Sequence, residues 1–103
     1  MSPTQRSLKY LREQGYQVGI TEHWNAFAKI RQDLFGFIDL LALRDGETLA
    51  VQTTSYSNVS ARVKKIADHE NLPMVRKAGW GIAVHGWHKA KNGKWEVRIV
   101  DLS

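Results

Sequence analysis

The feature that most constrains the fold is a short apolar run interrupted by one acid. Residues 37–43 read Phe-Ile-Asp-Leu-Leu-Ala-Leu. A nearly continuous apolar run of this length is typical of a central strand that is covered on both faces of its sheet. Burying the carboxylate of Asp39 in such a strand costs several kcal/mol unless it is paired, hydrogen-bonded or bound to a metal ion. The run therefore predicts a central strand and a specific use for its acid.

The next strand along the chain carries a second polar residue. Asp45-Gly46 predicts a turn, and residues 48–54 predict a strand rich in β-branched side chains. The turn makes the strands of Asp39 and Gln52 neighbours, and Gln52 and Thr54 share a face because they are two residues apart. Oxygen ligands on adjacent strands suit a hard cation such as Mg²⁺, which can activate water and polarise a phosphodiester.

The loop before the apolar run offers a further acid. Asp33 precedes Asp39 by six residues, and Gly36 lets the backbone turn closely into the strand. Each of these residues also has a simpler interpretation. Asp39 is then a strand-end residue bonded to backbone groups, Asp33 a turn residue, and Gln52 an ordinary buried amide.

Hydrophobic periodicity predicts an α/β fold for the whole chain. The expected elements are a helix over 5–14 capped by Thr4, strands over 16–24, 37–43 and 48–54 with a loop at 25–33, a helix beginning near 58, a short helix over 73–78, and strands over 81–91 and 94–102. Their order, α-β-β-β-α-β-β, predicts one mixed central sheet of about five strands flanked by helices. A length of 103 residues predicts a single domain over 1–103.

The last two strands form the clearest local motif. Asn92-Gly93 between them predicts a two-residue type I′ turn. With that turn, Trp87 lies opposite Arg98. One face of the hairpin is then basic and aromatic, with Trp87, Lys89, Lys91 and Arg98.

The charge is distributed unevenly along the chain. Residues 1–55 have no net charge, so the whole formal charge of +5 lies in residues 56–103. This asymmetry favours a polyanionic partner for the second half. The expected nucleic-acid contacts are Arg62, Lys64, Lys65, Trp87, Lys89, Lys91 and Arg98.

Composition also restricts the cellular setting. The chain has no cysteine, which excludes thiolate metal sites and leaves oxygen ligands. No apolar run approaches about 18 residues, and the first ten residues have no apolar core, so neither a membrane span nor a signal peptide is expected. A cytoplasmic location is the expectation.

The order of these motifs resembles the PD-(D/E)XK nuclease superfamily. A helix, Asp39 in an apolar strand, Gln52-Thr53-Thr54 in the next strand and then a basic helix are similar to its small Holliday-junction resolvase-like and VRR-type nuclease domains. The resemblance covers residues 4–103 and implies a restriction-endonuclease-like fold. It implies a Mg²⁺- or Mn²⁺-dependent endonuclease acting on structured or duplex DNA, including junctions.

The resemblance also implies roles for individual residues. Asp39 takes the place of the motif aspartate, Gln52 that of the second acid, and Glu13 matches an additional acid on the first helix. The implied metal ligands are Asp39, Gln52, Asp33 and Glu13.

Thr54 departs from the family pattern because it stands in the position of the catalytic lysine. One explanation is a lysine that has moved to the following helix, where Arg62 and Lys65 lie one turn apart. The implied catalytic set is then Asp39, Gln52, Thr54 and Lys65. The other explanation is a module that has lost catalysis and only binds DNA.

Two further expectations concern partners. A nuclease of this size has little surface for both strands of a duplex, which favours a homodimer. An unrelated α/β protein that binds other proteins is the third class of function compatible with the composition.

Overall fold

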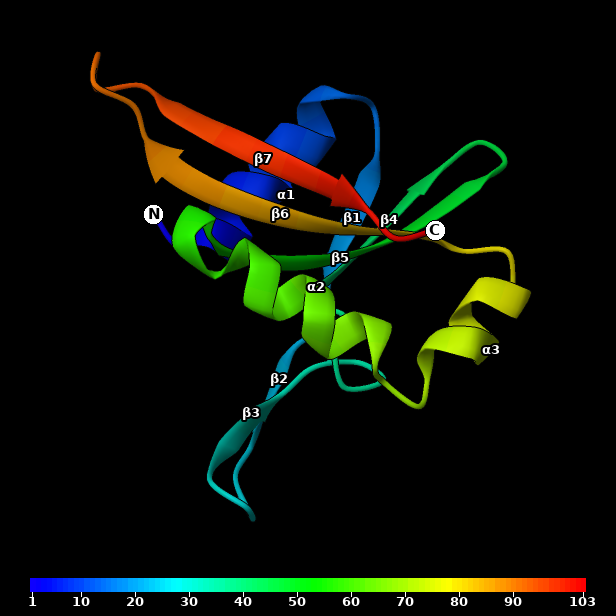
Figure 1. The fold of residues 1–103 in the computed structure, drawn as a ribbon. Helices are drawn as coiled ribbons and strands as arrows, with labels where there is room; N and C mark the ends of the chain where they lie inside the picture. The colour runs from blue at the N-terminus through cyan, green and yellow to red at the C-terminus, as the bar shows by residue number, and fades with distance from the viewer.

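A mixed sheet of five strands forms the centre of this computed structural model, which describes residues 1–103 (Figure 1). Its strands, in spatial order, are β1 (Gln17–Ile20), β4 (Leu40–Arg44), β5 (Glu47–Ser55), β6 (Gly81–Lys89) and β7 (Trp95–Asp101). Neighbours are antiparallel except β5 and β6, which pair in parallel. The predicted α/β class with a five-stranded mixed sheet flanked by helices is confirmed.

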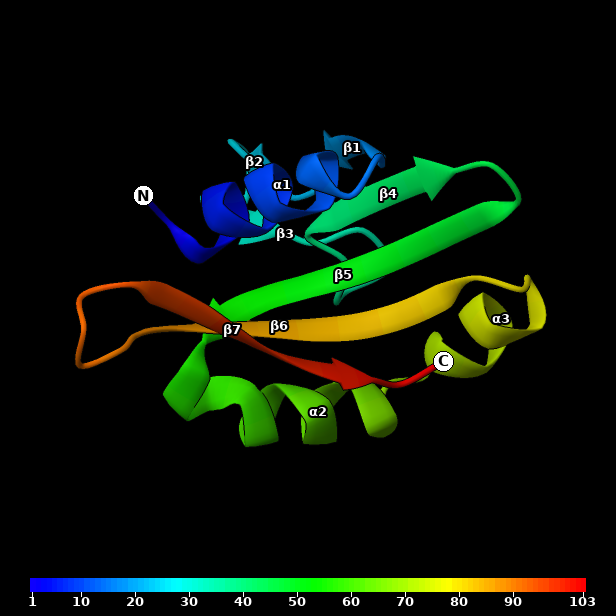
Figure 2. The same ribbon diagram turned by 90° about the horizontal axis from the view of Figure 1, so that it is seen from above.

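Helices cover both faces of the sheet. Figure 2 shows α1 (Pro3–Glu13) on one side and α2 (Val59–Ala67) on the other. Leu8 and Leu11 of α1 join one buried apolar cluster, and Val59 and Ile66 of α2 join a second. A 3₁₀ turn (Tyr56–Asn58) leads into α2, and α3 (Leu72–Lys77) extends the second cluster.

The two-sided covering explains the apolar strands that the sequence contains. Consecutive residues Ala50 and Val51 of β5 are both buried, one in each cluster, because successive side chains point to opposite faces. None of the three α-helices has the length and apolar character needed to cross a bilayer.

The first helix begins earlier than expected. Ser2 caps it by accepting a hydrogen bond from the amide of Gln5 (3.2 Å), so the prediction of Thr4 as the cap is wrong. Thr4 lies inside the first turn instead. Its hydroxyl is 2.8 Å from that of Thr53 on β5.

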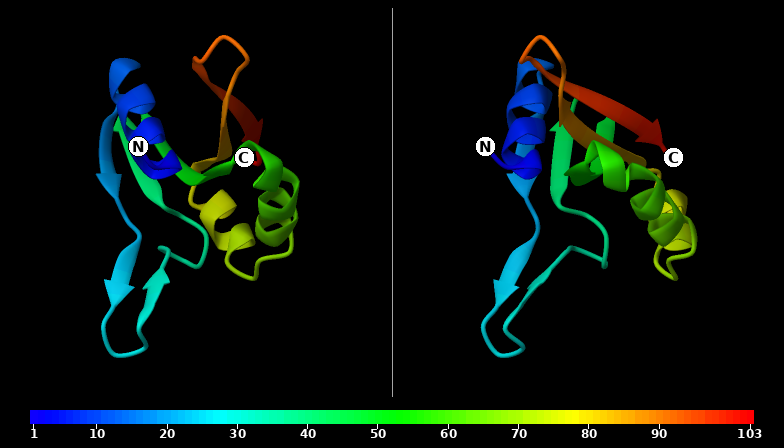
Figure 3. Two further views of the ribbon diagram at one scale, coloured as in Figure 1. Left: turned by 90° about the vertical axis from the view of Figure 1, so that its left-hand side faces the viewer. Right: turned by 60° about the vertical axis from the view of Figure 1, so that its left-hand side comes forward.

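Residues 25–33 form more structure than the expected loop. β2 (His23–Asn25) and β3 (Ile30–Gln32) pair as a separate hairpin that extends away from the main sheet (Figures 1 and 3). The Asn25 side chain starts its turn by accepting hydrogen bonds from the amides of Phe27 and Ala28 (3.0 Å each). The predicted strand over 16–24 is accordingly divided into β1 and β2.

The β6–β7 hairpin differs from the prediction by one residue in register. Trp87 pairs with Val97, because the loop is a three-residue type in which Gly93 alone has positive φ (82°). Such a shift moves every side chain of one strand to the other face. Arg98 consequently pairs with Gly86 and lies on the face opposite Trp87, so the expected basic and aromatic face is wrong.

The crossing of α2 over β6 generates a stability prediction. A Cβ added at Gly86 would collide with Cγ2 of Val59 and lie 3.3 Å from Cα of Tyr56. Gly86→Ala is expected to lower the free energy of unfolding by about 1–3 kcal/mol through overpacking. Urea unfolding of Gly86→Ala, Val59→Ala and the double variant measures it, and the double variant should lose less than the sum of the two.

Gly19→Ala on β1 is the matched control, because a Cβ there meets no atom within 4 Å. It is expected to change the free energy of unfolding by no more than about 0.5 kcal/mol. If Gly86→Ala and Gly19→Ala lower the free energy of unfolding equally, the close contact of β6 and α2 is contradicted.

Candidate active site

Asp39 stands at the beginning of β4, not in its middle. The strand starts at Leu40, and the preceding residues form a turn closed by a bridge between Leu34 and Ile38. The Asp39 amide still donates to the carbonyl of Val51 (2.9 Å), so the residue remains attached to β5. Its side chain is buried, with 4 % exposure. The prediction that Asp39 lies inside the strand is wrong, because the residue directly precedes the first residue of β4.

One oxygen of Asp39 accepts every hydrogen bond that its carboxylate receives. Oδ2 accepts from the Thr53 amide (2.8 Å), the Thr53 hydroxyl (3.3 Å) and the Gln52 amide nitrogen (3.1 Å). Oδ1 accepts none from the protein, which leaves it available to a ligand.

Gln52 joins two acids. Its Nε2 donates to Asp39 and, at 3.3 Å, to Oδ2 of Asp33. Its Oε1 is buried and has no hydrogen-bond partner. A buried amide oxygen without a partner is costly, which makes Gln52 more than an ordinary core amide.

The β2–β3 hairpin brings two more carboxylates to Asp39. Its last pair is His23 with Gln32, so Glu22 and Asp33 face each other at its base. Oxygens of Glu22, Asp33 and Asp39 lie within 4.8 Å of one another. The amide of Thr21 donates to the carbonyl of Asp39 (2.8 Å) and ties the hairpin to β4.

Glu22 is the site residue that sequence reasoning missed. Its position follows from the hairpin, which was itself missed. The available signal was the Asn25 turn, since a turn there places residues 22 and 33 at the same end of two paired segments.

The turn that holds Asp33 is tightly constrained. The Gly36 amide donates to the Asp33 carbonyl (3.0 Å), and Gly36 has a φ of 87°. A Cβ at Gly36 would collide with the imidazole of His69, as expected from a close approach of the backbone. Phe35 also has a positive φ (54°), and Asn71 holds its carbonyl (2.9 Å). Surrounding contacts therefore fix this unusual turn and the acid before it.

Basic side chains border the three acids. The Lys65 ammonium on α2 lies 3.9 Å from Oδ2 of Asp33, and the Arg31 guanidinium lies 3.8 Å from Glu22. Arg62, one turn before Lys65, lines the same cleft as Asp39. The cleft has a volume of about 360 Å³, and its lining is polar apart from Pro3.

Glu13 and Thr54, two other predicted site residues, differ in their position relative to the cleft. Glu13 is at the opposite end of α1 from Thr4, which lines the cleft, and nine residues of helix span roughly 13 Å. Glu13 is not among the clustered acids. Thr54 lines the cleft, is buried and brings no charge.

The expected DNA contacts are divided between α2 and the β6–β7 hairpin. Lys64 is exposed on α2, Lys89 and Lys91 are exposed near the tip of the β6–β7 hairpin, and Arg98 is exposed on β7. Trp87 is only 9 % exposed, and its indole nitrogen donates to the hydroxyl of Ser7 (2.8 Å).

The environment of Asp39 raises its pKa from 3.8 to about 7. Burial is the largest cause, and the hydrogen bond and charge of Asp33 add to it. The Thr53 amide and Gln52 oppose this shift by stabilising the charged form. A cation at the carboxylates would favour ionisation, so the site is better suited to three charged acids when a metal ion is bound.

Comparison with known families finds no matching family model, and no curated protein matches the chain. The chemistry of the cleft therefore follows from its own ligand set. Three carboxylates are donors that Mg²⁺ and Mn²⁺ prefer, and the cluster contains no histidine or sulfur ligand. The Gln52 amide turns its nitrogen toward these carboxylates in this structure.

The raised pKa of Asp39 predicts a pH-dependent stability in the absence of metal. Between pH 4 and 7 the folded protein binds a proton that the unfolded chain has released, so the free energy of unfolding falls as pH rises. Asp39→Asn keeps an acceptor for the Thr53 amide and removes the charge. It should be more stable than the wild type at pH 8, on the order of 2–4 kcal/mol, with the difference lost near pH 4.

Denaturant unfolding at a series of pH values in EDTA measures this difference. Asp45→Asn in the exposed β4–β5 turn is the control and should follow the wild-type curve. If Asp39→Asn also runs parallel to the wild type, the pKa of Asp39 is not raised.

Metal binding is expected to offset part of the stability that the protein loses when the buried Asp39 carboxylate is charged. Mg²⁺ or Mn²⁺ at ten times its dissociation constant stabilises the folded state by about 1.4 kcal/mol, which raises Tm by roughly 5 °C or more in a chain of this size. Thermal unfolding with and without metal should show this shift in the wild type and not in Asp39→Asn. An equal shift in both proteins would place the ion elsewhere.

Proposed function

We propose that the protein is a metal-dependent DNA endonuclease that hydrolyses a phosphodiester of structured or duplex DNA at the Asp39 cleft. The observation that carries this proposal is the convergence of Glu22, Asp33 and Asp39, with Lys65 at the edge of the cluster. The motif order that resembles PD-(D/E)XK nucleases supports a restriction-endonuclease-like fold for the same sheet.

The residues present fit a divalent cation. Oδ1 of Asp39 is free of protein donors, and Oε1 of Gln52 lacks any partner. Rotating the Gln52 amide by half a turn exchanges its oxygen and nitrogen, and would point the oxygen at the carboxylates. Glu22, Asp33, Asp39 and Gln52 would then hold the ion. A bound Mg²⁺ or Mn²⁺ would lower the pKa of a coordinated water and polarise the scissile phosphate.

Lys65 supplies the charge that Thr54 lacks. Its side chain is 40 % exposed, lies 3.9 Å from Asp33 and lines a neighbouring pocket that shares Asp33 with the cleft. In this proposal its ammonium turns past Asp33 toward a phosphate in the cleft. There it would stabilise negative charge on the phosphorus oxygens in the transition state. Arg62 would hold the adjacent phosphate. In this proposal a helix contributes the cation that the strand motif has lost.

Basic residues beyond the cleft support the DNA partner. Lys64 on α2 and Lys89, Lys91 and Arg98 on the β6–β7 hairpin are exposed and can contact phosphates. Trp87 is left out because its indole is buried against α1. A homodimer in the cytoplasm of a bacterial or infected host cell belongs to the same proposal, because the basic residues of a second copy could reach the second strand of a duplex.

The competing function is a DNA-binding module without catalysis. Thr54 favours it, since the lysine position holds no charge, and Asp33 partly neutralises Lys65. In that case the acids are structural, and Asp39→Asn leaves DNA binding unchanged or improves it by removing a negative charge.

Cleavage of branched, duplex and single-stranded DNA in Mg²⁺ or Mn²⁺ tests the proposal. The wild type should cleave, and Asp39→Asn and Lys65→Met should each lower the rate about 10²–10⁴-fold. Lys77→Met is the control, because Lys77 is an exposed lysine on α3.

The outcomes separate the two functions. Cleavage that persists at the wild-type rate in Asp39→Asn would contradict an active site at this cleft. Salt-sensitive DNA binding with no metal-dependent cleavage by the wild type would establish the module instead.

A further inference from the structure

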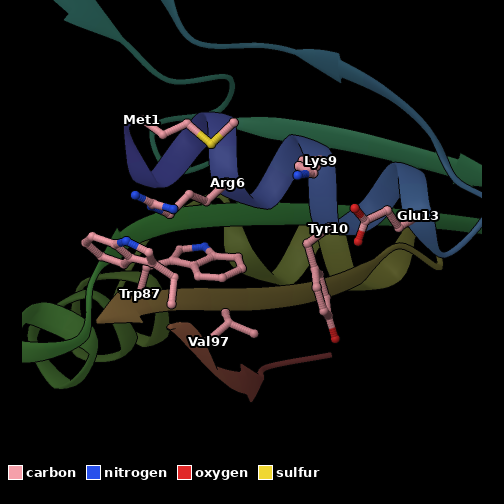
Figure 4. Close-up of a pocket in the computed structure, with 8 residues that line it drawn as sticks. Met1, Arg6, Lys9, Tyr10, Glu13, Trp87 and Val97 are labelled. Atoms are coloured by element: carbon pink, nitrogen blue, oxygen red, sulfur yellow. The ribbon is translucent and has the colours of Figure 1, made fainter. Parts of the chain in front are cut away.

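A second cavity lies between α1 and the β6–β7 hairpin. Its volume is about 330 Å³, and Figure 4 shows side chains of α1 reaching over Trp87 and Val97. Its walls are mainly basic and aromatic, from Arg6, Lys9 and Tyr10 on α1 and Trp87 and Trp95 on the hairpin. We refer to it as the aromatic groove.

The stacking surface of the groove is already organised. The Arg6 guanidinium carbon lies 3.6 Å from the centre of the Trp95 ring, which is the distance of a stacked cation–π pair. Nε of Arg6 is buried without a hydrogen-bond partner. Tyr10 meets Trp87 edge to face at 6.0 Å, and the Ser7 hydroxyl fixes the Trp87 indole. Trp95, which is 44 % exposed, is the ring that a ligand can reach, and Trp87 forms a buried wall behind it.

The groove lies directly beside the acidic cleft. Ser55 lines the cleft and pairs with Trp87 on the neighbouring strand, and such strands are about 4.8 Å apart. On the helix side, Thr4 lines the cleft, whereas Met1 and Arg6 line the groove. The first turn of α1 thus separates two adjoining sites.

The chemistry of the groove distinguishes it from a phosphate site. Aromatic rings and guanidinium planes are the surfaces on which unpaired bases stack. Lys9 provides a charge for an adjacent phosphate, whereas Glu13 at one end is the only acid in the lining and repels the backbone there.

We propose that the aromatic groove binds an unpaired nucleobase of a single DNA strand whose neighbouring phosphodiester enters the cleft. This inference rests on the proposed function and deepens it. Bases in a continuous duplex are stacked on one another and offer no free face. The preferred substrate is therefore DNA with an unpaired segment, such as a flap, a bubble or an open branch point.

Equilibrium binding in EDTA tests the groove apart from cleavage. Fluorescence anisotropy with a labelled single-stranded oligonucleotide should show at least fivefold weaker binding for Trp95→Ala, the loss expected from one stacked base. Trp24→Ala on β2 is the matched control, since Trp24 is 58 % exposed and Trp95 is 44 % exposed. Trp24→Ala should bind the single-stranded oligonucleotide with wild-type affinity. Both Trp24→Ala and Trp95→Ala should bind duplex DNA with wild-type affinity.

Two further measurements separate stacking from charge. Arg6→Lys keeps the charge and loses the planar guanidinium, so it should also weaken single-strand binding. Oligonucleotides with an abasic site at successive positions should bind the wild type more weakly at one position. Trp95→Ala should bind the intact oligonucleotide and the one with an abasic site at that position with equal affinity. The abasic series uses only the wild type, so it decides the question even if a variant fails to fold.

The outcomes keep the two proposals apart. Unchanged single-strand affinity in Trp95→Ala and Arg6→Lys, with no sensitive abasic position, overturns the groove even if Asp39-dependent cleavage occurs. The expected losses with no metal-dependent cleavage by the wild type uphold the groove and refute the nuclease.

Discussion

The hydrogen bond from the Thr53 amide to the Asp39 carboxylate is the interaction on which the site depends. It joins the residue before β4 to the backbone of β5 at 2.8 Å and places Gln52 beside the same oxygen. The bond offsets part of the cost of burying the acid, yet the pKa of Asp39 stays high because burial and, after it, the nearby Asp33 outweigh the bond. The molecule thus keeps a buried carboxylate whose Oδ1 accepts no hydrogen bond from the protein, and a cation there would favour the charged form.

The charged groups around the cleft come from different elements. Asp39 lies just before β4 and Gln52 on β5, and the base of a small hairpin holds Glu22 and Asp33. Lys65 approaches the cluster from α2 on a partly exposed side chain. Segments far apart in the sequence therefore supply the three acids and the cation beside them.

The sequence alone predicted the features that depend on local hydrophobic pattern and on a tight turn. Apolar periodicity predicted the helix over 5–14 and the helix that begins near 58, and both are present as α1 and α2. The Asp45-Gly46 turn made Asp39 and Gln52 neighbours. It failed where tertiary contacts decide. The β2–β3 strands are too short to show periodicity, so Glu22 was missed. The β6–β7 register follows a loop type that Asn-Gly does not determine. The direction of α1 keeps Glu13 from the cleft, and one sequence alone does not give it.

The parallel pairing of β5 with β6 has a consequence for how the molecule assembles. The hydrogen bond from the Thr53 amide to Asp39 joins residues that are only 14 positions apart in the sequence. The aromatic groove needs Ser7 and Trp87, which are 80 residues apart. Loop-closure entropy makes long-range contacts slower to form. During folding, the contact between Asp39 and Thr53 can therefore form before the contact between α1 and β6 that completes the groove.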